Sequence, residues 1–491
     1  MGRKVLAAKS GRAACSCAAA GDGIAAKNAK GAKSFSTGFT GLREASVKPA
    51  KTKPSGVAWI GDIPEWWEVV PARHIFEEVT AKNKNGQYTR QLSFRYGEIV
   101  DKGPNQSHNA SPEETILTYT IVEPDTIMIN GLNLNYDLLS FRVAIVKEIG
   151  IITSAYLAVV PQGSRIIPLY ALYLLKAYDF KMVFHGQGSG IRMTLKFADF
   201  AALPIVLPPL VEQKAIAAYL DDKCGAIDAA IAEAKKGIEE YKAWKKSLIF
   251  EVVTGKRRVG FFNAESQSRR VAEKMKSSGI PWIGDVPMGW EVKRLKYVAS
   301  CNDDSLAEDT SSDFSFDYVD VGSVKYGLGI VHREPMVFAD APSRARRVVR
   351  KDDVIVSTVR TYLKSVAQIP SFNKPIIVST GFAVLRAKNS DVIFLNYALQ
   401  SQSFVDEVEA RSTGISYPAI NASDLVGIKL PLPPLSEQKA IAAYFDEKCA
   451  AIDKMVAEKE ALIADLEAYK KSLIFEVVTG KREVASNSMV K

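Results

Sequence analysis

Residues 207–257 read LPPLVEQKAIAAYLDDKCGAIDAAIAEAKKGIEEYKAWKKSLIFEVVTGKR, and residues 432–482 read LPPLSEQKAIAAYFDEKCAAIDKMVAEKEALIADLEAYKKSLIFEVVTGKR. The second stretch follows the first at an offset of 225 residues (432 less 207), with no gap. Of the 51 aligned positions 16 differ, so 51 less 16, or 35, are identical, and the identities gather at the two ends. A long internal repeat of this kind indicates that the architecture itself is duplicated.

Apolar residues in each copy recur at steps of four and three, which is the pattern of a coiled-coil seam. Paired prolines near the start of each copy precede its helical pattern, and Gly255 or Gly480 stands where a helix C-terminal cap belongs. Each copy is therefore predicted to be one helix of about 39 residues, roughly 58 Å long at ~1.5 Å per residue, too long to be stable alone with an exposed apolar stripe.

The natural packing partner of one predicted helix is the other. Lys245, Lys459 and Lys470 interrupt the apolar stripe, so we expect the pairing to loosen or change partner there. The residues predicted to pack the helices are Ile216, Leu220, Ile227, Ile231, Ile238, Leu248, Ile441, Phe445, Ile452, Val456, Ile463, Leu466 and Leu473.

The regions outside the long helices repeat more weakly. Residues 59–64, WIGDIP, followed by Trp67, return as residues 282–287, WIGDVP, followed by Trp290, at an offset of 223 residues. The chain therefore runs in the order globular region, long helix, globular region, long helix.

These paired motifs carry a resemblance. The GxIPxxW-type motifs at 61–67 and 284–290, the paired LPPLxEQ helix starts and the paired KKSLIFEVVTGK helix ends together resemble the specificity subunit of type I restriction-modification systems, over residues 55–482. The resemblance implies that the globular regions are target-recognition domains, each reading one half of a split DNA sequence. It also implies that the helices hold these domains apart and dock two methyltransferase subunits and, through them, restriction subunits. S-adenosylmethionine, Mg²⁺ and ATP would then belong to the partner subunits, with no cofactor on this chain.

The expected fold class is α+β, with two α/β target-recognition domains separated by two long helices that form an antiparallel coiled coil, in an internal pseudo-twofold repeat. The expected segments are a disordered basic extension (1–53), the first target-recognition domain (54–206), the first spacer helix (207–257), a linker (258–278), the second target-recognition domain (279–431), the second spacer helix (432–482) and a tail (483–491). Predicted strands cover 126–129, 151–160, 318–321, 354–359 and 376–385, and predicted helices cover 168–184 and 395–409.

The net positive charge of the chain comes from its first 53 residues. They hold eight Lys and three Arg against Asp22 and Glu44, a balance of 11 less 2, or +9, which equals the net charge of the whole chain. Net charge is therefore no evidence that the folded part binds DNA. We interpret the extension as a floppy tail or an over-long start in preference to a DNA-grasping arm, and it lacks the apolar region of a signal peptide.

The five cysteines and four histidines form no metal-ligand spacing. Cys224 and Cys449 occupy equivalent helix positions, where packing as small apolar residues is favoured over a disulfide bridge, and this usage suits a reducing cytoplasm. The sequence has no apolar run of about 18 residues, so it predicts no membrane span.

Candidate DNA contacts in the first globular region combine cations, amides and one aromatic residue. Arg pairs with guanine and Asn or Gln with adenine in the major groove, whereas Lys and further Arg hold phosphates. For each residue the alternative is an ordinary solvated position. The candidates are Arg90, Arg95, Tyr96, Arg142, Gln187, Arg192 and Lys196, together with Asn130 and Asn133.

Candidates in the second globular region fall into three groups. Arg344, Arg346 and Arg347 belong to a basic run that predicts either a strand facing phosphates or an edge strand protected by charge. Arg360, Tyr362 and Lys364 follow a predicted strand and form the sharper group, while Ser416 and Tyr417 lie between Gly414 and Pro418.

The chain carries no motif for chemistry of its own. A cofactor-binding glycine-rich loop, an Asn-Pro-Pro-aromatic or Asp-Pro-Pro-aromatic motif and a phosphate-binding G-x-x-x-x-G-K-[ST] loop are all missing from the sequence. We therefore expect a non-catalytic recognition subunit whose half-site centres lie on the order of one DNA turn, ~34 Å, apart, set by the length of the helices. The alternative is a coiled-coil scaffold with protein-binding end domains.

Overall fold

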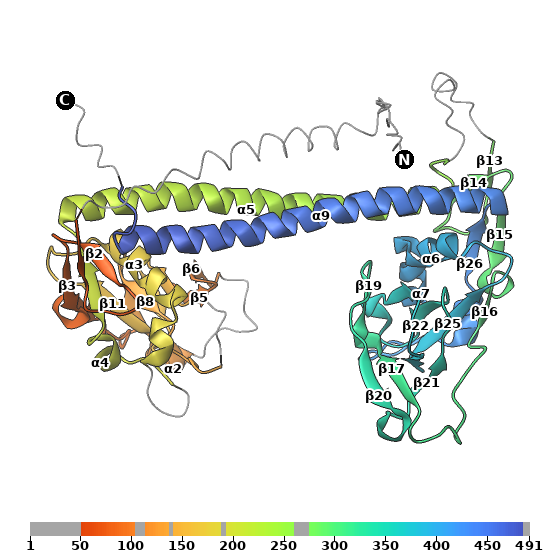
Figure 1. The fold of residues 1–491 in the computed structure, drawn as a ribbon, viewed down its shortest axis with the longest axis horizontal. Helices are drawn as coiled ribbons and strands as arrows, with labels where there is room; N and C mark the ends of the chain where they lie inside the picture. The colour runs from red at the N-terminus through yellow and green to blue at the C-terminus, as the bar shows by residue number, and fades with distance from the viewer. Residues whose placement is uncertain (1–50, 104–112, 137–140, 188–192, 260–273, 485–491) are drawn as a thin grey trace, which may run out of the picture. The chain divides into compact units, whose positions relative to one another are not determined.

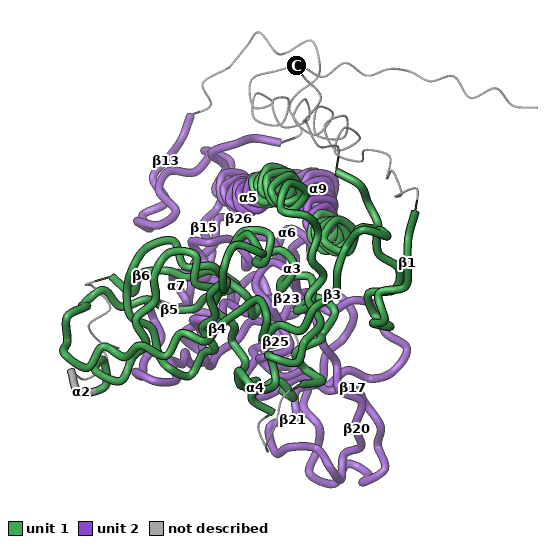
Figure 2. Tube along the Cα trace, turned by 90° about the vertical axis from the view of Figure 1, so that its left-hand side faces the viewer, with its two compact units in different colours: residues 1–231, 464–491 green, residues 232–463 purple. Residues whose placement is uncertain are grey.

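The computed structural model describes residues 51–103, 113–136, 141–187, 193–259 and 274–484 (Figure 1). The chain divides into two compact units (Figure 2): unit 1 contains residues 1–231 and 464–491, and unit 2 contains residues 232–463. The prediction treated each long helix as a segment separate from the globular regions. In the structure, each long helix is divided between the two units. Most of the predicted extension, linker and tail lies outside the described residues.

The two long helices, α5 (Leu210–Val253) and α9 (Leu435–Val478), are each 44 residues long and so exceed the predicted 39. Each begins directly after a proline pair and ends shortly before a glycine with positive φ, +73° at Gly255 and +69° at Gly480. The proline pair prevents the helix from extending further toward the N-terminus, and a glycine in the left-handed conformation terminates it at the C-terminus. The local sequence therefore sets both ends of each helix.

Unit 1 is built on a four-stranded antiparallel sheet in the order β4-β11-β8-β9, with α3 (Pro168–Phe180) packed against β9. These strands are β4 (Phe76–Glu78), β11 (Leu157–Pro161), β8 (Ile127–Ile129) and β9 (Val143–Ile145). Two-stranded pairs surround it: β1 (Thr52–Pro54) with β2 (Asp62–Pro64), β3 (Glu68–Pro71) with β12 (Pro204–Leu207), β5 (Leu92–Arg95) with β6 (Glu98–Asp101), and β7 (Thr120–Val122) with β10 (Gly150–Ile152). Short helices are η1 (Ala72–His74), α2 (Glu113–Ile116), η3 (Val183–Gly186) and α4 (Phe197–Phe200).

Unit 2 contains a sheet of the same order, β16-β25-β22-β23, and a second four-stranded sheet, β20-β17-β24-β21. The strands of these two sheets are β16 (Ala299–Cys301), β25 (Phe382–Ala387), β22 (Val354–Ser357), β23 (Val366–Gln368), β20 (Glu334–Val337), β17 (Ser315–Val319), β24 (Ile376–Ser379) and β21 (Ala345–Val348). The pairs are β13 (Met275–Ser277) with β14 (Asp285–Pro287), β15 (Glu291–Arg294) with β26 (Lys429–Leu432), and β18 (Val324–Lys325) with β19 (Gly329–Ile330). The helices are η5 (Leu295–Tyr297), η6 (Val321–Ser323), η7 (Phe338–Asp340), η8 (Thr361–Leu363), α6 (Val392–Gln400), α7 (Gln402–Ala410) and α8 (Ala422–Val426).

Several predicted elements are interrupted in the structure. The predicted strand 376–385 is two strands, β24 and β25, because the chain turns at Gly381, where a Cβ atom would lie 2.8 Å from Val359 Cγ2. Residues 151–160 are likewise split between β10 and β11. The predicted helix 395–409 is divided into α6 and α7 at Ser401. Residues 52 and 53, predicted to belong to the disordered extension, are part of β1, and residues 275–277, predicted to be linker, form β13.

The repeated tryptophan motifs attach to the starts of the long helices. In unit 1, Trp67 Nε1 donates to Glu212 Oε2 at 2.8 Å and Trp66 Nε1 donates to Oε1 at 2.6 Å. In unit 2, Trp290 Nε1 donates to Glu437 Oε2 at 3.0 Å. The glutamate of each LPPLxEQ stretch therefore accepts hydrogen bonds from the tryptophan of the GxIPxxW-type motif in its own unit.

The glutamine of each LPPLxEQ stretch is buried and fixes the helix that follows the central sheet. Gln213 accepts from the backbone N–H of Ile167, just before α3, at 2.9 Å, and Gln438 accepts from the N–H of Asp391, just before α6, at 2.9 Å. Buried amides are stable only when they are hydrogen-bonded, which explains why this residue type stands at both positions.

Each unit also holds the end of one long helix against the same tryptophan motif. Gly480, after α9, lies so close to Pro64 of unit 1 that a Cβ atom would be 2.3 Å from Pro64 Cδ, and Gly255, after α5, has the same relation to Pro287 of unit 2 at 2.4 Å. The start of one helix and the end of the other are thus joined within each unit.

The lysines that interrupt the apolar stripe reach acidic or aromatic side chains of the other helix. In unit 1, Lys470 Nζ lies 2.6 Å from a carboxylate oxygen of Asp228 on the other helix. In unit 2, Lys245 Nζ lies 2.7 Å from the equivalent Asp453, and the ammonium of Lys459 is 6.0 Å from the centroid of the Tyr241 ring. Their alkyl stems cover the apolar seam while the charged ends reach the partner helix.

The predicted packing residues lie mainly in the interior. All thirteen are buried except Val456 and Ile463, which are half-buried. Cys224 and Cys449 are buried free thiols, and burial raises the pKa of Cys224 to about 11.

Candidate nucleic-acid interface

The turn between β22 and β23 presents polar and aromatic side chains on unit 2. Strand β22 ends at Ser357, and the chain reverses through Arg360 and Lys364, both in the left-handed region with φ of +52° and +51°. Arg360 and Tyr362 are exposed at this turn, and Thr361 between them is buried. Alternate residues therefore anchor the turn and face solvent.

Residues 411–420 form a loop that is tied to this turn. Thr413 and Ala419 exchange two backbone hydrogen bonds of 2.9 Å, and the N–H of Ile420 donates to the carbonyl of Thr358 at 2.9 Å. Thr361 Oγ1 donates to Ser412 Oγ at 2.8 Å. The loop and the turn thus form one surface, here called the unit 2 tip surface, defined by Val359, Arg360, Tyr362, Ile415, Ser416 and Tyr417.

The structure brings four of the predicted DNA contacts together on the unit 2 tip surface: Arg360, Tyr362, Ser416 and Tyr417. The guanidinium carbon of Arg360 lies 5.1 Å from the centroid of the Tyr417 ring, which is the geometry of a cation–π contact. Arg360 forms no ion pair with a carboxylate of the residues that the structure describes, so its charge is available to DNA.

Lys364, the third residue predicted in this group, is engaged by carboxylates of its own unit. Its ammonium lies 2.7 Å from Asp406 and 3.5 Å from Glu409 on α7. Partial burial works to lower the pKa of Lys364, but the hydrogen bonds and charges of these two carboxylates outweigh it and raise the pKa. Lys364 therefore fastens α7 to the turn.

The three predicted arginines of the basic run do not share one open face. β21 is the edge strand of its sheet, as the protected-edge alternative proposed. Arg346 is half-buried with its guanidinium 4.8 Å from the centroid of the Phe338 ring, and Arg347 is half-buried too. Of the three, Arg344 alone is exposed. Its carbonyl accepts a hydrogen bond from the backbone N–H of Thr380. The next residue, Gly381, packs against Val359. Arg344 therefore borders the unit 2 tip surface.

In unit 1 the turn between β8 and β9 has an equivalent support. The N–H of Leu195 donates to the carbonyl of Gly131 at 2.9 Å, and the N–H of Leu134 donates to the carbonyl of Met193 at 3.2 Å. Asn133, with φ +51°, is exposed, and Tyr136 is 77% exposed. The sequence reasoning missed Tyr136, although a tyrosine soon after the strand was the signal that selected Tyr362.

The β5–β6 hairpin carries Arg95 and Tyr96 at its tip. Tyr96 and Gly97 have φ of +50° and +77°, and Tyr96 is 92% exposed. A Cβ atom on Gly97 would lie 2.8 Å from Phe141 Cβ, so the hairpin tip packs beside the end of the β8–β9 turn. Arg95, Tyr96, Asn133 and Tyr136 therefore lie at the tips of neighbouring segments of unit 1.

Two other predicted contacts of unit 1 serve the structure instead. Arg142 is fully buried, and its Nη1 donates to the carbonyls of Asn130 and Leu132 at 2.8 and 2.9 Å, so it cannot reach DNA and instead shapes the β8–β9 turn. Arg90 pairs with Glu148 and, at 2.8 Å, with Asp101, and the hydrogen bonds of these carboxylates raise its pKa. Its charge is already compensated.

The remaining predicted contacts of unit 1 are dispersed. Gln187 is exposed after η3, and Lys196 is exposed at the N-cap of α4. Asn130 is half-buried and accepts the N–H of Leu132 at 3.2 Å. Arg192 lies outside the described residues.

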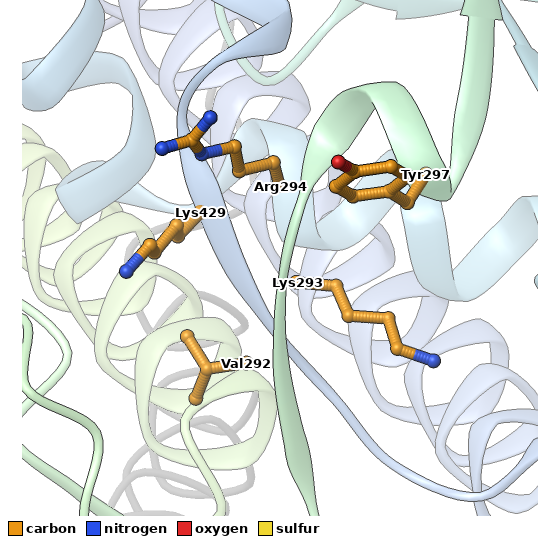
Figure 3. Close-up of a pocket in the computed structure, with 5 residues that line it drawn as sticks. All are labelled: Val292, Lys293, Arg294, Tyr297 and Lys429. Atoms are coloured by element: carbon orange, nitrogen blue, oxygen red, sulfur yellow. The ribbon is translucent and has the colours of Figure 1, made fainter.

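A shallow basic hollow lies elsewhere on unit 2, between β15, η5 and β26. It is lined by Val292, Lys293, Arg294, Tyr297 and Lys429. Figure 3 shows that the ammonium of Lys293 points away from the charged ends of Arg294 and Lys429. Lys293 is also paired with Glu291 at 2.5 Å, so these cations do not converge on one anion.

Within the described ranges, no three His, Cys, Asp or Glu side chains gather as metal ligands would. None of the helices in that part of the chain has the length and apolar character needed to cross a bilayer.

Comparisons with known proteins point to one family. The profile of the type I restriction modification DNA specificity domain matches residues 287–463. The MjaX specificity subunit assigned to a type I restriction enzyme of Methanocaldococcus jannaschii is 28% identical over 447 residues, which cover 87% of this chain and 96% of that protein. The MjaVIII specificity subunit of the same organism is 28% identical over 344 residues, covering 68% of this chain and 75% of the relative.

A solved chain of a type I R-M system has a similar fold. Its TM-score is 0.61 at 17% identity, and the alignment covers 85% of this chain and 98% of the solved chain. At that identity the likeness bears on the fold alone.

Proposed function

We propose, on the premise that this chain belongs to the DNA specificity subunits of type I restriction-modification systems, that unit 1 and unit 2 each read one half of a split DNA target. The chain is the recognition component and is not itself an enzyme. The observation that carries the proposal is that both units place a turn of different sequence on a sheet of the same order. A shared frame with different tips is what reading two different half-sites requires.

The residues proposed to contact DNA are those exposed at these tips or beside them. In unit 2 they are Arg344, Arg360, Tyr362, Ser416 and Tyr417, and in unit 1 they are Arg95, Tyr96, Asn133 and Tyr136. Arginine offers bidentate pairing to guanine or a contact to phosphate, and asparagine pairs with adenine. Exposed tyrosines add apolar area and a hydroxyl at low entropy cost.

The long helices are proposed to act as an antiparallel coiled coil that relates the two units by a pseudo-twofold axis. The ion pairs Asp228–Lys470 and Asp453–Lys245 support this, because each residue of one pair lies at the repeat-equivalent position of the other. Methyltransferase subunits, and restriction subunits through them, are proposed to dock on this frame in the cytoplasm. S-adenosylmethionine, Mg²⁺ and ATP are proposed to be bound by those partners.

The proposal is tested by mapping modified bases in DNA from a host that makes this chain with its partner methyltransferase subunit, beside a host that lacks this chain. The expected result is a split motif with N6-methyladenine in each half, which disappears without the chain. Modification that persists without the chain would reject the specificity role. If no motif is modified, competition by random DNA distinguishes sequence-specific binding from a scaffold that retains DNA only non-specifically.

Matched substitutions in the two units test which unit reads which half-site. Arg360→Ala is expected to weaken discrimination in one half-site only, and Tyr136→Ala in the other, each by about 1–3 kcal/mol per base contact, or roughly 5- to 150-fold. Lys236→Ala, on the exposed face of α5, is the control and should change neither half. Equal loss in both halves from Arg360→Ala, with the fold intact, would contradict the assignment of one half-site to each unit.

A further inference from the structure

Ile415 has an exposure that the fold alone does not explain. Its side chain is 103% exposed, more than the other large apolar side chains of the described residues. Single exposed apolar residues are common on proteins, but this one has exposed apolar neighbours on the same surface: Tyr417 at 66%, Tyr362 at 48% and Val359 at 37%. A clustered apolar surface of this kind marks a binding site more often than an isolated residue does.

The loop that carries Ile415 is braced on several sides. Besides the paired hydrogen bonds of Thr413 and Ala419, the N–H of Thr361 donates to the carbonyl of Pro418 at 3.4 Å, and Ser412 Oγ donates to the carbonyl of Val408 at 2.7 Å. Gly414 has φ +105°, and a Cβ atom there would lie 3.2 Å from the carbonyl oxygen of Tyr417. An apolar side chain is therefore presented on a supported tip, and little ordering entropy remains to be lost on binding.

Charges around the loop favour a polyanion as the occupant. The acidic residues of the adjoining helix α7 are already compensated: Asp406 and Glu409 pair with Lys364, and Glu407 pairs with Arg411 at 2.6 Å. Arg360, by contrast, faces the Tyr417 ring. A protruding apolar residue beside an available arginine suits stacked bases flanked by phosphates better than it suits the apolar pocket of a protein partner.

We infer that Ile415 is a wedge that inserts between two base pairs of the half-site read by unit 2 and unstacks them, beside the base that Arg360 contacts. This inference rests on the proposed function. Apolar side chains inserted at a base step kink DNA at a cost of a few kcal/mol, which is recovered through added contacts. A methyltransferase must take its target base out of the stack, so a local distortion made by the recognition chain would lower the cost of that step. The loop at the corresponding place in unit 1 includes residues 188–192, outside the described residues, so the inference concerns unit 2 alone.

The test places 2-aminopurine, which brightens when it is unstacked, at successive positions of the unit 2 half-site other than the methylated adenine. The duplexes are mixed with the complex of the full chain and its methyltransferase subunit. A several-fold rise in fluorescence is expected at one base step. Ile415→Ala should abolish most of the rise, and Ile415→Leu, which keeps the apolar volume, should restore it. Leu328→Ala, which removes another exposed apolar side chain of unit 2, is the control and should leave the rise unchanged.

The outcomes separate the inference from the function on which it rests. Specific binding with no rise at any step, or with a rise that Ile415→Ala does not reduce, overturns the wedge and leaves the proposed function standing. If random DNA displaces the half-site duplex as well as specific DNA does, the proposed function itself fails. Loss of the methyltransferase subunit from the Ile415→Ala complex in gel filtration, with the rise intact in the remaining complex, would show that the loop docks protein instead.

Discussion

Arg142 shows how a buried cation can shape an exposed turn. Its guanidinium is buried and donates to the carbonyls of Asn130 and Leu132, while its own backbone N–H donates to Asp179 at 2.8 Å. These bonds hold the turn that exposes Asn133 and Tyr136. A buried charge is tolerated only when such partners surround it, so the position demands arginine for structural reasons.

Replacing Arg142 should therefore weaken unit 1 before it alters any base preference. Arg142→Met removes the donors and leaves two carbonyls without this partner, at an expected cost of about 2–4 kcal/mol in the free energy of unfolding of unit 1. Denaturant unfolding followed by a probe in unit 1 measures this cost. Arg95→Met, at the exposed hairpin tip, is the matched control and should leave stability within about 0.5 kcal/mol. Wild-type stability in Arg142→Met together with altered half-site preference would instead make Arg142 a reading residue.

At the scale of elements, the ends of the long helices bind the repeated tryptophan motif of each unit. The start of each helix accepts tryptophan hydrogen bonds through Glu212 or Glu437, and the end of the other helix brings Gly480 or Gly255 against the proline of the same motif. The tryptophan–glutamate hydrogen bonds join segments more than 140 residues apart in sequence. The positions that are identical in the two copies gather at these ends, where the contacts with the tryptophan motifs are made.

Two glycines of the long helices should respond to alanine in opposite directions. Gly480→Ala places a Cβ atom in a left-handed backbone and against Pro64, so we expect a loss of about 2–4 kcal/mol in stability. Gly225→Ala, inside α5 with open space around it, should gain about 0.5–1 kcal/mol because alanine is the better helix former. Thermal unfolding of both variants measures the difference. A neutral Gly480→Ala would mean that the end of α9 does not pack on Pro64 in solution.

At the scale of the whole molecule, the proposed ruler depends on the stretches of helix between the two cross-helix ion pairs. Residues 232–238 of α5 and 457–463 of α9 are repeat-equivalent and lie between Asp228 and Lys245 and between Asp453 and Lys470. Removing both heptads together keeps each ion pair inside its own unit. It also shortens the frame by about 10 Å at ~1.5 Å per residue.

We expect this double deletion to shorten the preferred gap between half-sites by up to about three base pairs at ~3.4 Å each, with both half-sites unchanged. Base-modification mapping of a library with varied gaps measures the change. A chain in which the same heptads are replaced by others of equal length should keep the original gap. An unaltered gap after the deletion would reject the ruler.

Local sequence patterns were enough to predict the long helices, where they begin and end, and which of their residues are buried. An apolar repeat of four and three, a proline pair and a terminal glycine each act on a few neighbouring residues, and the duplication showed which stretches correspond. The same patterns selected Arg360, Tyr362, Ser416 and Tyr417, which the structure brings onto one surface.

Only the tertiary structure decided which charged residues remain available and where elements break. Lys364 is compensated by carboxylates of α7, Arg90 by Glu148, and Arg142 is enclosed by carbonyls, none of which the neighbouring sequence reveals. The strand predicted at 376–385 is broken because its two halves belong to different sheets: β24 pairs with β17 and β21, and β25 pairs with β16 and β22. Whether a side chain is free to bind depends on partners that are distant in sequence, and these are fixed when the chain closes on itself.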